Sequence, residues 1–219
     1  MIVGGTGSRM SLVSTLYRGV DLLSKNVNKP EQASCPFAQD RDGMVVGEGA
    51  GAIVLESKQF AENRGANILC DVGGWSRGYH RLDSDGFSAD LQYHLAAATD
   101  RAGLKADQID LVNANAMGAV IGDAQEAQAI AGALGTTPVV AHKGAFGNLG
   151  PGTSMVELIA SILTIQKQHV PPTLNCQTIA ADCPINVLNR DSPALTKINN
   201  VLKSSYSATG QIATVVIQK

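Results

Sequence analysis

The sequence has few aromatic residues and no surplus of charge of either sign. Aromatic residues make up 4% of the 219 residues, and they comprise four phenylalanines, four tyrosines and one tryptophan. Lysine and arginine total 17 against 19 aspartates and glutamates, which gives a formal net charge of −2. Proteins that hold nucleic acid or anionic lipid by charge carry a basic surplus. We therefore expect neither nucleic acid nor a membrane among the partners.

Long apolar runs are also missing. No stretch of about 18 apolar residues occurs, so we expect no segment that spans a bilayer. The apolar stretch at the N-terminus, Met1–Val3, is too short for a secretory signal. Together these absences predict a cytoplasmic chain.

The cysteine pattern excludes the common metal and redox motifs. The four cysteines, Cys35, Cys70, Cys176 and Cys183, include no Cys-x-x-Cys pair, and no histidine lies at metal-ligand spacing from them. We expect no metal and no cofactor. Cys176 and Cys183 are close enough in sequence for a disulfide, but free thiols are the favoured alternative in a cytoplasmic chain.

The residues that are abundant predict an α/β protein. Apolar residues, mostly Ala, Val, Ile and Leu, make up 44% of the chain, charged residues make up 16%, and there are 23 glycines. This mixture is typical of buried parallel strands that pack against helices, and less so of an antiparallel sandwich.

From residue 68 onward, predicted strands and helices alternate. We expect strands at Ile68–Gly74, Ile109–Ala114, Val139–Ala141, Ile198–Ser204 and Gln211–Gln218, and helices at Ala89–Ala102, Asp123–Leu134 and Ser154–Gln168. Trp75–Gly86 is expected to be a loop. The order β-α-β-α-β-α-β-β predicts a five-stranded mixed sheet with right-handed crossovers.

The earlier part of the chain does not belong to this unit. It contains two predicted strands, Met1–Val3 and Gly49–Glu56, and a predicted helix, Leu12–Ser24. The helix predicted at Ser154–Gln168 is apolar on nearly all sides, as if it were sandwiched between sheets. We therefore expect the two early strands in a second, incomplete sheet on the far side of that helix.

Two glycine clusters resemble nucleotide-binding loops only in part. Gly4–Gly7 follows a strand as a dinucleotide fingerprint would, but the third glycine of that motif is absent. Gly147–Ser154 has the length of a phosphate loop but lacks its lysine. The second cluster is instead predicted to be a turn that lets the backbone approach a pocket or another subunit closely.

Three longer segments carry a more specific pattern. Residues 35–56 read CPFAQDRDGMVVGEGAGAIVLE, residues 110–130 contain LVNAN followed by GDAQEAQAI, and residues 143–175 contain KGAFGNLG followed by VPPTLN. In this order and at these separations they resemble the elongating β-ketoacyl-acyl carrier protein synthases, which are condensing enzymes of the thiolase superfamily. The resemblance covers nearly the whole chain.

This resemblance implies a thiolase-like fold built from two similar halves. Residues 63–219 would form one complete C-terminal half, and residues 1–62 would be a remnant of the N-terminal half. It also implies acyl transfer as the family activity, an acyl carrier protein or acyl thioester as partner, and a homo- or hetero-oligomer.

The resemblance assigns the catalytic positions, and here the sequence departs from the family. Asn115 and Asn148 occupy the positions of the two family histidines, whereas Lys143 is retained. The family nucleophile is a cysteine of the first half, and none of the four cysteines here lies in a matching motif. Met117, Phe146 and Tyr206 are predicted to contact the substrate.

Two acidic residues are expected to have structural roles. Asp123 begins a capping pattern with Glu126, three residues later. Glu157 is either the acidic residue that the family retains, paired with Lys143, or the second member of a capping box that Ser154 begins.

Two functions remain open from the sequence. The first is a synthase-like protein that does not condense acyl chains and serves as a partner subunit or carrier-protein-binding module. The second is the C-terminal part of an active condensing enzyme whose cysteine nucleophile comes from a separate or missing N-terminal half.

Overall fold

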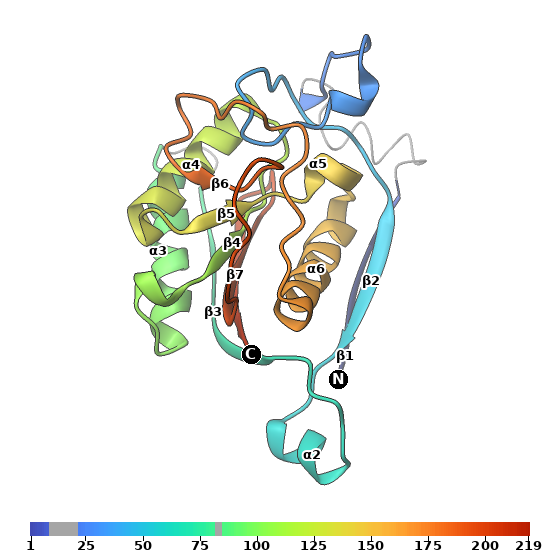
Figure 1. Ribbon diagram of the computed structural model, residues 1–219, viewed down its shortest axis with the longest axis vertical. Coiled ribbons are helices and arrows are strands. Elements are labelled where there is room, and N and C mark those ends of the chain that lie inside the picture. Colours follow the sequence, from blue (N-terminus) through green and yellow to red (C-terminus); the bar gives the residue numbers. More distant parts are fainter. Residues whose placement is uncertain (9–21, 82–84) are drawn as a thin grey trace.

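The main sheet has six strands, one more than expected. In the computed structural model, which describes residues 1–8, 22–81 and 85–219, the strand order is β3-β8-β7-β4-β5-β6 (Figure 1). The strands are β3 (Asp71–Tyr79), β4 (Leu111–Asn113), β5 (Pro138–Val140), β6 (Asn186–Val187), β7 (Asn200–Tyr206) and β8 (Gln211–Gln218). β8 runs antiparallel to β3 and β7, and the other pairs are parallel. The sixth strand, β6, has only two residues, too few for a periodic pattern.

Helices cover both faces of this sheet. α3 (Phe87–Arg101) and α4 (Val120–Leu134) lie on one face, and α6 (Thr153–Lys167) lies on the other (Figure 1). One apolar core fills the space under α3 and α4, and a second fills the space under α6. The remaining helices are short: α2 (Lys58–Asn63), α5 (Lys143–Phe146) and the 3-10 turns η2 (Pro30–Gln32), η3 (Ala106–Gln108) and η4 (Gly150–Gly152).

The two early strands form a separate antiparallel pair on the far side of α6, as the sequence predicted. β1 (Ile2–Gly7) and β2 (Gly49–Val54) pair with each other, and α6 lies between them and the main sheet (Figure 1). Glycine permits this close layer: a Cβ atom on Gly51 would lie 2.7 Å from Ile159 Cδ1 on α6. Small residues on β1 and β2 therefore let the helix approach the strands.

The predicted loop at Trp75–Gly86 is wrong in its first half, because β3 continues to Tyr79 and pairs with β8 throughout. Gly78 in this segment suggested a loop, but it serves packing. A Cβ atom on Gly78 would lie 2.1 Å from His94 Nε2 on α3. Glycine in a strand here marks the close approach of a helix.

Other boundaries shift by a few residues. α4 begins at Val120, so Asp123 lies inside the helix and does not cap it. The predicted helix Leu12–Ser24 lies almost wholly outside the described residues. α6 is not buried on every side, because Leu163 is 52% exposed.

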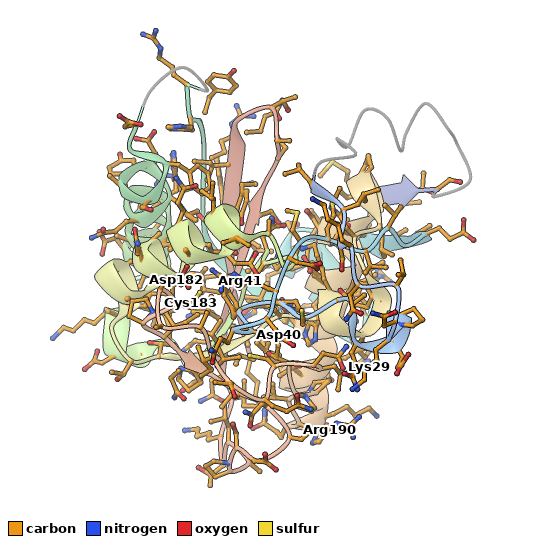
Figure 2. The ribbon with its side chains drawn as sticks, turned by 90° about the horizontal axis from the view of Figure 1, so that it is seen from above. Lys29, Asp40, Arg41, Asp182, Cys183 and Arg190 are labelled. Carbon is orange, nitrogen blue, oxygen red and sulfur yellow. The ribbon has the colours of Figure 1, made fainter. Side chains whose placement is uncertain are left out.

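An ion pair joins the early segment to the C-terminal half. Arg41 is buried, and its Nη2 atom lies 2.8 Å from Asp182 Oδ2 and donates to the carbonyl of Val120 at 2.8 Å (Figure 2). Within the part of the chain that the structure describes, no helix is long and apolar enough to cross a bilayer.

We expect the chain to self-associate or to need a partner, with residues 1–56 at the contact. Among the described residues β1 and β2 pair only with each other, so their outer edges are open to pairing with another chain. The cross-strand neighbours Ile2 and Val54 are 78% and 61% exposed. Sedimentation equilibrium at micromolar concentration should show association, and Val54→Lys should weaken it.

Ile121→Lys is the matched control, because Ile121 on α4 is also exposed but lies outside residues 1–56. A chain that stays monomeric and binds no hydrophobic dye would contradict this expectation.

Candidate functional site

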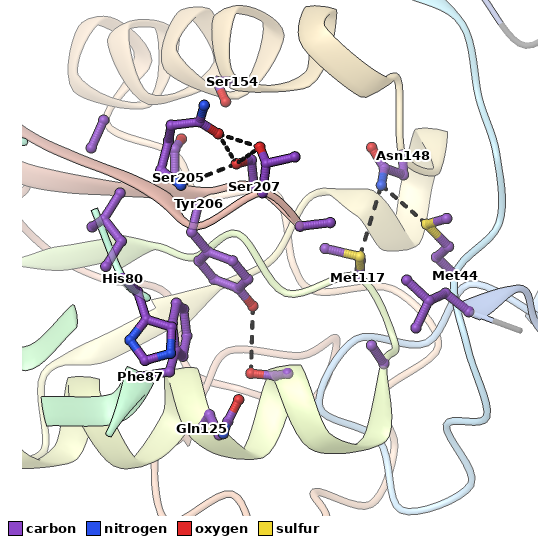
Figure 3. A pocket seen from close by; sticks show the side chains of 18 of the residues that line it. Met44, His80, Phe87, Met117, Gln125, Asn148, Ser154, Ser205, Tyr206 and Ser207 are labelled. Carbon is purple, nitrogen blue, oxygen red and sulfur yellow. Dashed lines mark hydrogen bonds between the residues drawn. The ribbon is translucent and has the colours of Figure 1, made fainter. Parts of the chain in front are cut away.

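A large cavity of about 1240 Å³ opens where the β7–β8 turn meets the starts of α4 and α6 (Figure 3). Three predicted site residues line it, namely Met117, Asn148 and Tyr206. Its wall combines apolar side chains (Met44, Phe87, Ile212) with hydroxyl groups (Ser154, Ser205, Ser207, Thr209). A mostly apolar cavity with a few polar groups is typical of a small-molecule site.

The other predicted residues lie elsewhere. Phe146 lines a separate hollow of about 430 Å³, together with Glu31 and Glu48. Asn115 and Lys143 do not line the cavity; they are 3% and 1% exposed and lie behind its wall. Met117, Asn148 and Tyr206 thus line the cavity, whereas Asn115 and Lys143 are buried behind its wall.

The Asn148 carboxamide joins the cavity wall to the start of α6. Its Oδ1 accepts hydrogen bonds from the Gly150 backbone N–H at 2.9 Å and from Thr153 Oγ1 at 3.1 Å. Its Nδ2 lies 3.1 Å from Met44 Sδ and 3.8 Å from Met117 Sδ (Figure 3). Thioether sulfur is a weak acceptor, so both contacts are weak hydrogen bonds.

Asn115 is held from three sides. Its backbone N–H donates to Glu126 Oε1 at 2.8 Å, and its Nδ2 donates to the Tyr206 carbonyl at 3.4 Å. Lys143 Nζ donates to its Oδ1 at 3.2 Å and also to its backbone carbonyl. The side chain therefore supports the cavity wall from behind.

Behind this wall lies a cluster of buried charges. Glu157, fully buried on α6, has Lys143 Nζ 2.9 Å from Oε1 and Lys203 Nζ 2.8 Å from Oε2. Burial raises the pKa of Glu157, but the two ammonium groups outweigh it and hold the pKa below its ordinary value. Burial lowers the pKa of Lys203, and Glu157 opposes that shift. The pairing with Lys143 is the one expected from the sequence.

The alternative capping role for Glu157 is wrong. Gly152 precedes α6 without a side-chain cap, and Ser154 lies inside the helix and lines the cavity. Asp123 is structural in a different way than predicted. Its buried carboxylate accepts hydrogen bonds from the backbone N–H groups of Phe37, Met117 and Gly118, each at 3.0 Å.

Glu126 links the charge cluster to the cavity. It is fully buried, and its Oε2 accepts a hydrogen bond from the Tyr206 hydroxyl at 3.4 Å. Burial raises the pKa of Glu126 to about 7, although the Asn115 N–H, Lys203 and Lys143 each favour the charged form. The pKa of Tyr206 is raised by burial and by the nearby carboxylates.

No cysteine in the chain is activated. All four are free thiols, and no disulfide joins Cys176 and Cys183. Burial raises the pKa of Cys35 and Cys183 to about 12 and that of Cys176 to about 11, and it also raises the pKa of Cys70. Since the thiolate is the nucleophile, each thiol is a poor one at neutral pH. Among the described residues, no group of three or more His, Cys, Asp or Glu could hold a metal ion.

Sequence reasoning missed Lys203 and the full role of Glu126. Lys203 follows Val201 and Leu202 near the end of the predicted strand Ile198–Ser204, and a charged residue in a strand is usually read as facing water. A strand that is covered on both faces buries its side chains, so a lysine in such a strand must be buried. The position of Lys203 in a strand of this kind was the available signal.

Comparisons with known proteins agree with this architecture. A family profile described as "Beta-ketoacyl synthase, C-terminal domain" matches residues 78–177, and one described as "Beta-ketoacyl synthase, N-terminal domain" matches residues 1–61. The mitochondrial 3-oxoacyl-[acyl-carrier-protein] synthase of Arabidopsis thaliana is 40% identical over 188 residues, which cover 80% of this chain and 40% of that protein. The 3-oxoacyl-[acyl-carrier-protein] synthase 2 of Mycobacterium tuberculosis is 36% identical over 172 residues, 76% of this chain and 41% of that protein.

Solved structures match over the whole chain. One is a type II polyketide ketosynthase bound to a hexaketide in complex with its acyl-carrier protein; it is 26% identical with a TM-score of 0.92, and this chain covers 55% of it. Another is the ishigamide ketosynthase/chain length factor, 26% identical with a TM-score of 0.87 and 53% covered. A β-ketoacyl synthase from Burkholderia phymatum, 24% identical with a TM-score of 0.92 and 54% covered, supports the fold alone.

The fold and the position of the cavity define a thiolase-like condensing-enzyme architecture. The chain belongs to the β-ketoacyl synthase family. It spans about half the length of the curated relatives that it matches.

Breaking the buried ion pair should destabilise the fold strongly. Lys143→Met leaves Glu157 with one of its two ammonium partners, and removing one partner of a buried pair typically costs about 3–5 kcal/mol. Urea unfolding followed by Trp75 fluorescence measures the loss.

Arg64→Met, which breaks the exposed pair with Glu56, is the control and should leave the free energy of unfolding nearly unchanged. Equal losses in the two variants would contradict the central role of the buried pair.

The pKa of Glu126 predicts a pH-dependent stability. A buried carboxyl whose pKa rises from 4.5 to about 7 on folding contributes stability that is full below pH 4.5 and is lost as pH rises through 7. The free energy of unfolding of the wild type, relative to Glu126→Gln, should therefore fall between about pH 4.5 and 7 and stay constant above.

Comparison with Glu126→Gln is needed because burial lowers the pKa of His142 to about 4, which changes stability in an overlapping range with the opposite sign. A flat difference between the two proteins across this range would show that Glu126 has the same pKa in the folded and unfolded chains.

Proposed function

We propose that the chain is a β-ketoacyl synthase-like module of fatty acid or polyketide biosynthesis that does not itself catalyse condensation. One observation carries the proposal: carboxamides stand at both predicted imidazole positions. Asn115 and Asn148 donate hydrogen bonds but do not titrate at neutral pH. In the family, the two imidazoles at these positions stabilise the enolate that forms as malonyl thioester decarboxylates. Losing one such donor typically costs about 10²–10³ in rate.

The state of the cysteines supports the same proposal. A condensing enzyme carries the acyl chain as a thioester on a cysteine. Forming that thioester requires an activated thiolate as the nucleophile. Burial raises the pKa of every thiol in this chain. Acyl transfer to one of these sulfurs is therefore unfavourable.

The cavity supports a binding role for an acyl thioester. Met44, Met117 and Phe87 offer apolar contact to an acyl chain, and the hydroxyl group of Ser154 offers polar contact to a thioester carbonyl. The solved ketosynthase bound to a hexaketide is described in complex with an acyl-carrier protein. We propose an acyl carrier protein as the partner that delivers the thioester here.

The division of the chain and its assembly belong to the same proposal. Residues 1–62 would be a portion of the N-terminal half and residues 63–219 the C-terminal half, a division that the two matched profiles support. The ketosynthase/chain length factor among the structural relatives supports a paired subunit as the working form.

A second candidate is the C-terminal part of an active condensing enzyme completed by a separate polypeptide. The observation that favours it is a set of large exposed side chains on two elements. Trp75 and Tyr79 of the edge strand β3 are 53% and 60% exposed, and Leu163 of α6 is 52% exposed. Contact with another chain would remove these side chains from water.

The activity test separates the candidates. We expect the purified chain to form no β-ketoacyl product from acyl and malonyl thioesters, because it lacks an activated thiol and both imidazoles. Product is measured by mass spectrometry, with the Arabidopsis mitochondrial synthase as the positive control. Condensation that is lost on replacing one of the four cysteines would overturn the first candidate. Product that forms only after a polypeptide with an active-site cysteine is added would support the second.

A further inference from the structure

One imidazole lines the cavity, and the proposed function does not use it. His80 follows the last residue of β3, is buried, and lines the cavity beside Phe87 (Figure 3). It is the one histidine among the cavity-lining residues that the structure describes. Because Asn115 and Asn148 stand at the two predicted imidazole positions, His80 is the side chain that brings an imidazole to this cavity.

Asp90 on α3 orients the His80 ring. Its Oδ2 atom lies 2.8 Å from Nδ1 of His80. An ionised carboxylate only accepts hydrogen bonds, so Nδ1 carries a hydrogen and donates it to Asp90. In a neutral imidazole one nitrogen is the donor and the other is the acceptor, so the lone pair of His80 lies at Nε2.

Further contacts fix the position of the ring. The backbone N–H of His80 donates to the Gly210 carbonyl in the β7–β8 turn at 2.8 Å. The imidazole meets the Phe87 ring edge to face with the centroids 5.5 Å apart, and Phe87 meets Tyr206 in the same way at 4.9 Å. Contacts from α3 and from the β7–β8 turn therefore hold the imidazole in the cavity wall.

The second ring nitrogen of His80 is available to a ligand. Nε2 has no hydrogen-bond partner among the described residues, and unlike Nε2 of His142 it is not sealed from solvent. The open space that His80 lines is the cavity. An acyl chain that fills this space without a hydrogen-bond donor leaves the acceptor unpaired, which costs free energy.

We propose that His80, oriented by Asp90, accepts a hydrogen bond through Nε2 from a hydroxyl group on a bound acyl chain. The cavity then selects hydroxylated acyl thioesters over saturated ones. A hydroxyl donates, whereas a ketone or a thioester carbonyl only accepts. His80 is in this role a specificity-determining residue. The inference rests on the proposed function, because it takes an acyl thioester as the ligand.

The affinities of a series of thioesters test this. The probes are octanoyl-N-acetylcysteamine and its analogues with a hydroxyl at carbon 3, 6 or 7 or a ketone at carbon 6 or 7. They are titrated by calorimetry at pH 8, which favours the neutral imidazole. At least one hydroxylated analogue should bind the wild type about three- to tenfold more tightly than the octanoyl thioester, the usual net effect of one hydrogen bond. The ketones should show no such gain.

Two variants assign the gain to particular residues. His80→Phe keeps a ring against Phe87 and removes both nitrogens, so it should bind the hydroxylated and octanoyl thioesters equally well. Asp90→Ala, at a side chain that is half exposed, should reduce the gain because the His80 ring loses its orientation. His169→Phe is the matched control. His169 is exposed and does not line the cavity, so this variant should keep the full gain.

The inference is overturned if no hydroxylated analogue gains affinity, if a ketone gains as much, or if the full gain persists in His80→Phe or in Asp90→Ala. Should His80→Phe fail to fold, Asp90→Ala decides by the same comparison. The octanoyl thioester keeps the two proposals apart. If it binds the wild type and no hydroxyl adds affinity, this inference alone fails. If no thioester binds, the proposed function fails with it.

Discussion

The buried carboxylate of Glu157 is the constraint on which the rest of the structure depends. Removing such a charge from water costs several kcal/mol, so it must be matched by cations held at short range. Lys143 comes from α5 and Lys203 from β7, which places three elements around one point. The backbone carbonyl of the same glutamate accepts a hydrogen bond from Asn113 on β4. One residue of α6 therefore ties the helix to the centre of the main sheet, and the position of the cavity follows from that anchor.

The same helix could not occupy this position without small residues on its other side. At Gly5, β1 approaches the turn η4 that precedes α6, and a Cβ atom there would lie 2.8 Å from the Pro151 carbonyl oxygen. At Gly51, β2 approaches α6 itself, and a Cβ atom there would lie 2.7 Å from Ile159. The helix thus has a polar, charge-matched contact on one side and a close glycine contact on the other. This arrangement explains why α6 carries buried polar residues as well as apolar ones. A helix with a single apolar face packed on a core would bury mainly apolar residues.

Much of the fold could be predicted from the sequence because its signals are local. Strand–helix alternation after residue 68 and the apolar character of Ser154–Gln168 depend on neighbouring residues, and the structure confirms both. The failures have non-local causes. Gly78 indicated a loop because the helix that requires a glycine there, α3, begins nine residues later. Lys203 and Glu126 are distant in sequence, so their contribution to one charge cluster is visible only in three dimensions. The motif segments marked Asn115, Lys143 and Asn148 as positions of interest, but not which of them line the cavity.

Both asparagines form hydrogen bonds that hold the site together. Asn115 accepts from Lys143 through its carboxamide oxygen and donates through its amide to the strand that carries Tyr206. Asn148 uses its oxygen to hold the first turn of α6. An imidazole in either place would add a titratable group beside a cluster that is already close to charge balance, whereas a carboxamide supplies the hydrogen bonds without adding charge. Hydrogen bonds thus hold the cavity wall in place, although neither of these two positions carries an acid–base group. A mostly apolar cavity of this kind is suited to holding an acyl chain, which is the basis of the proposal that the chain binds acyl groups and does not condense them.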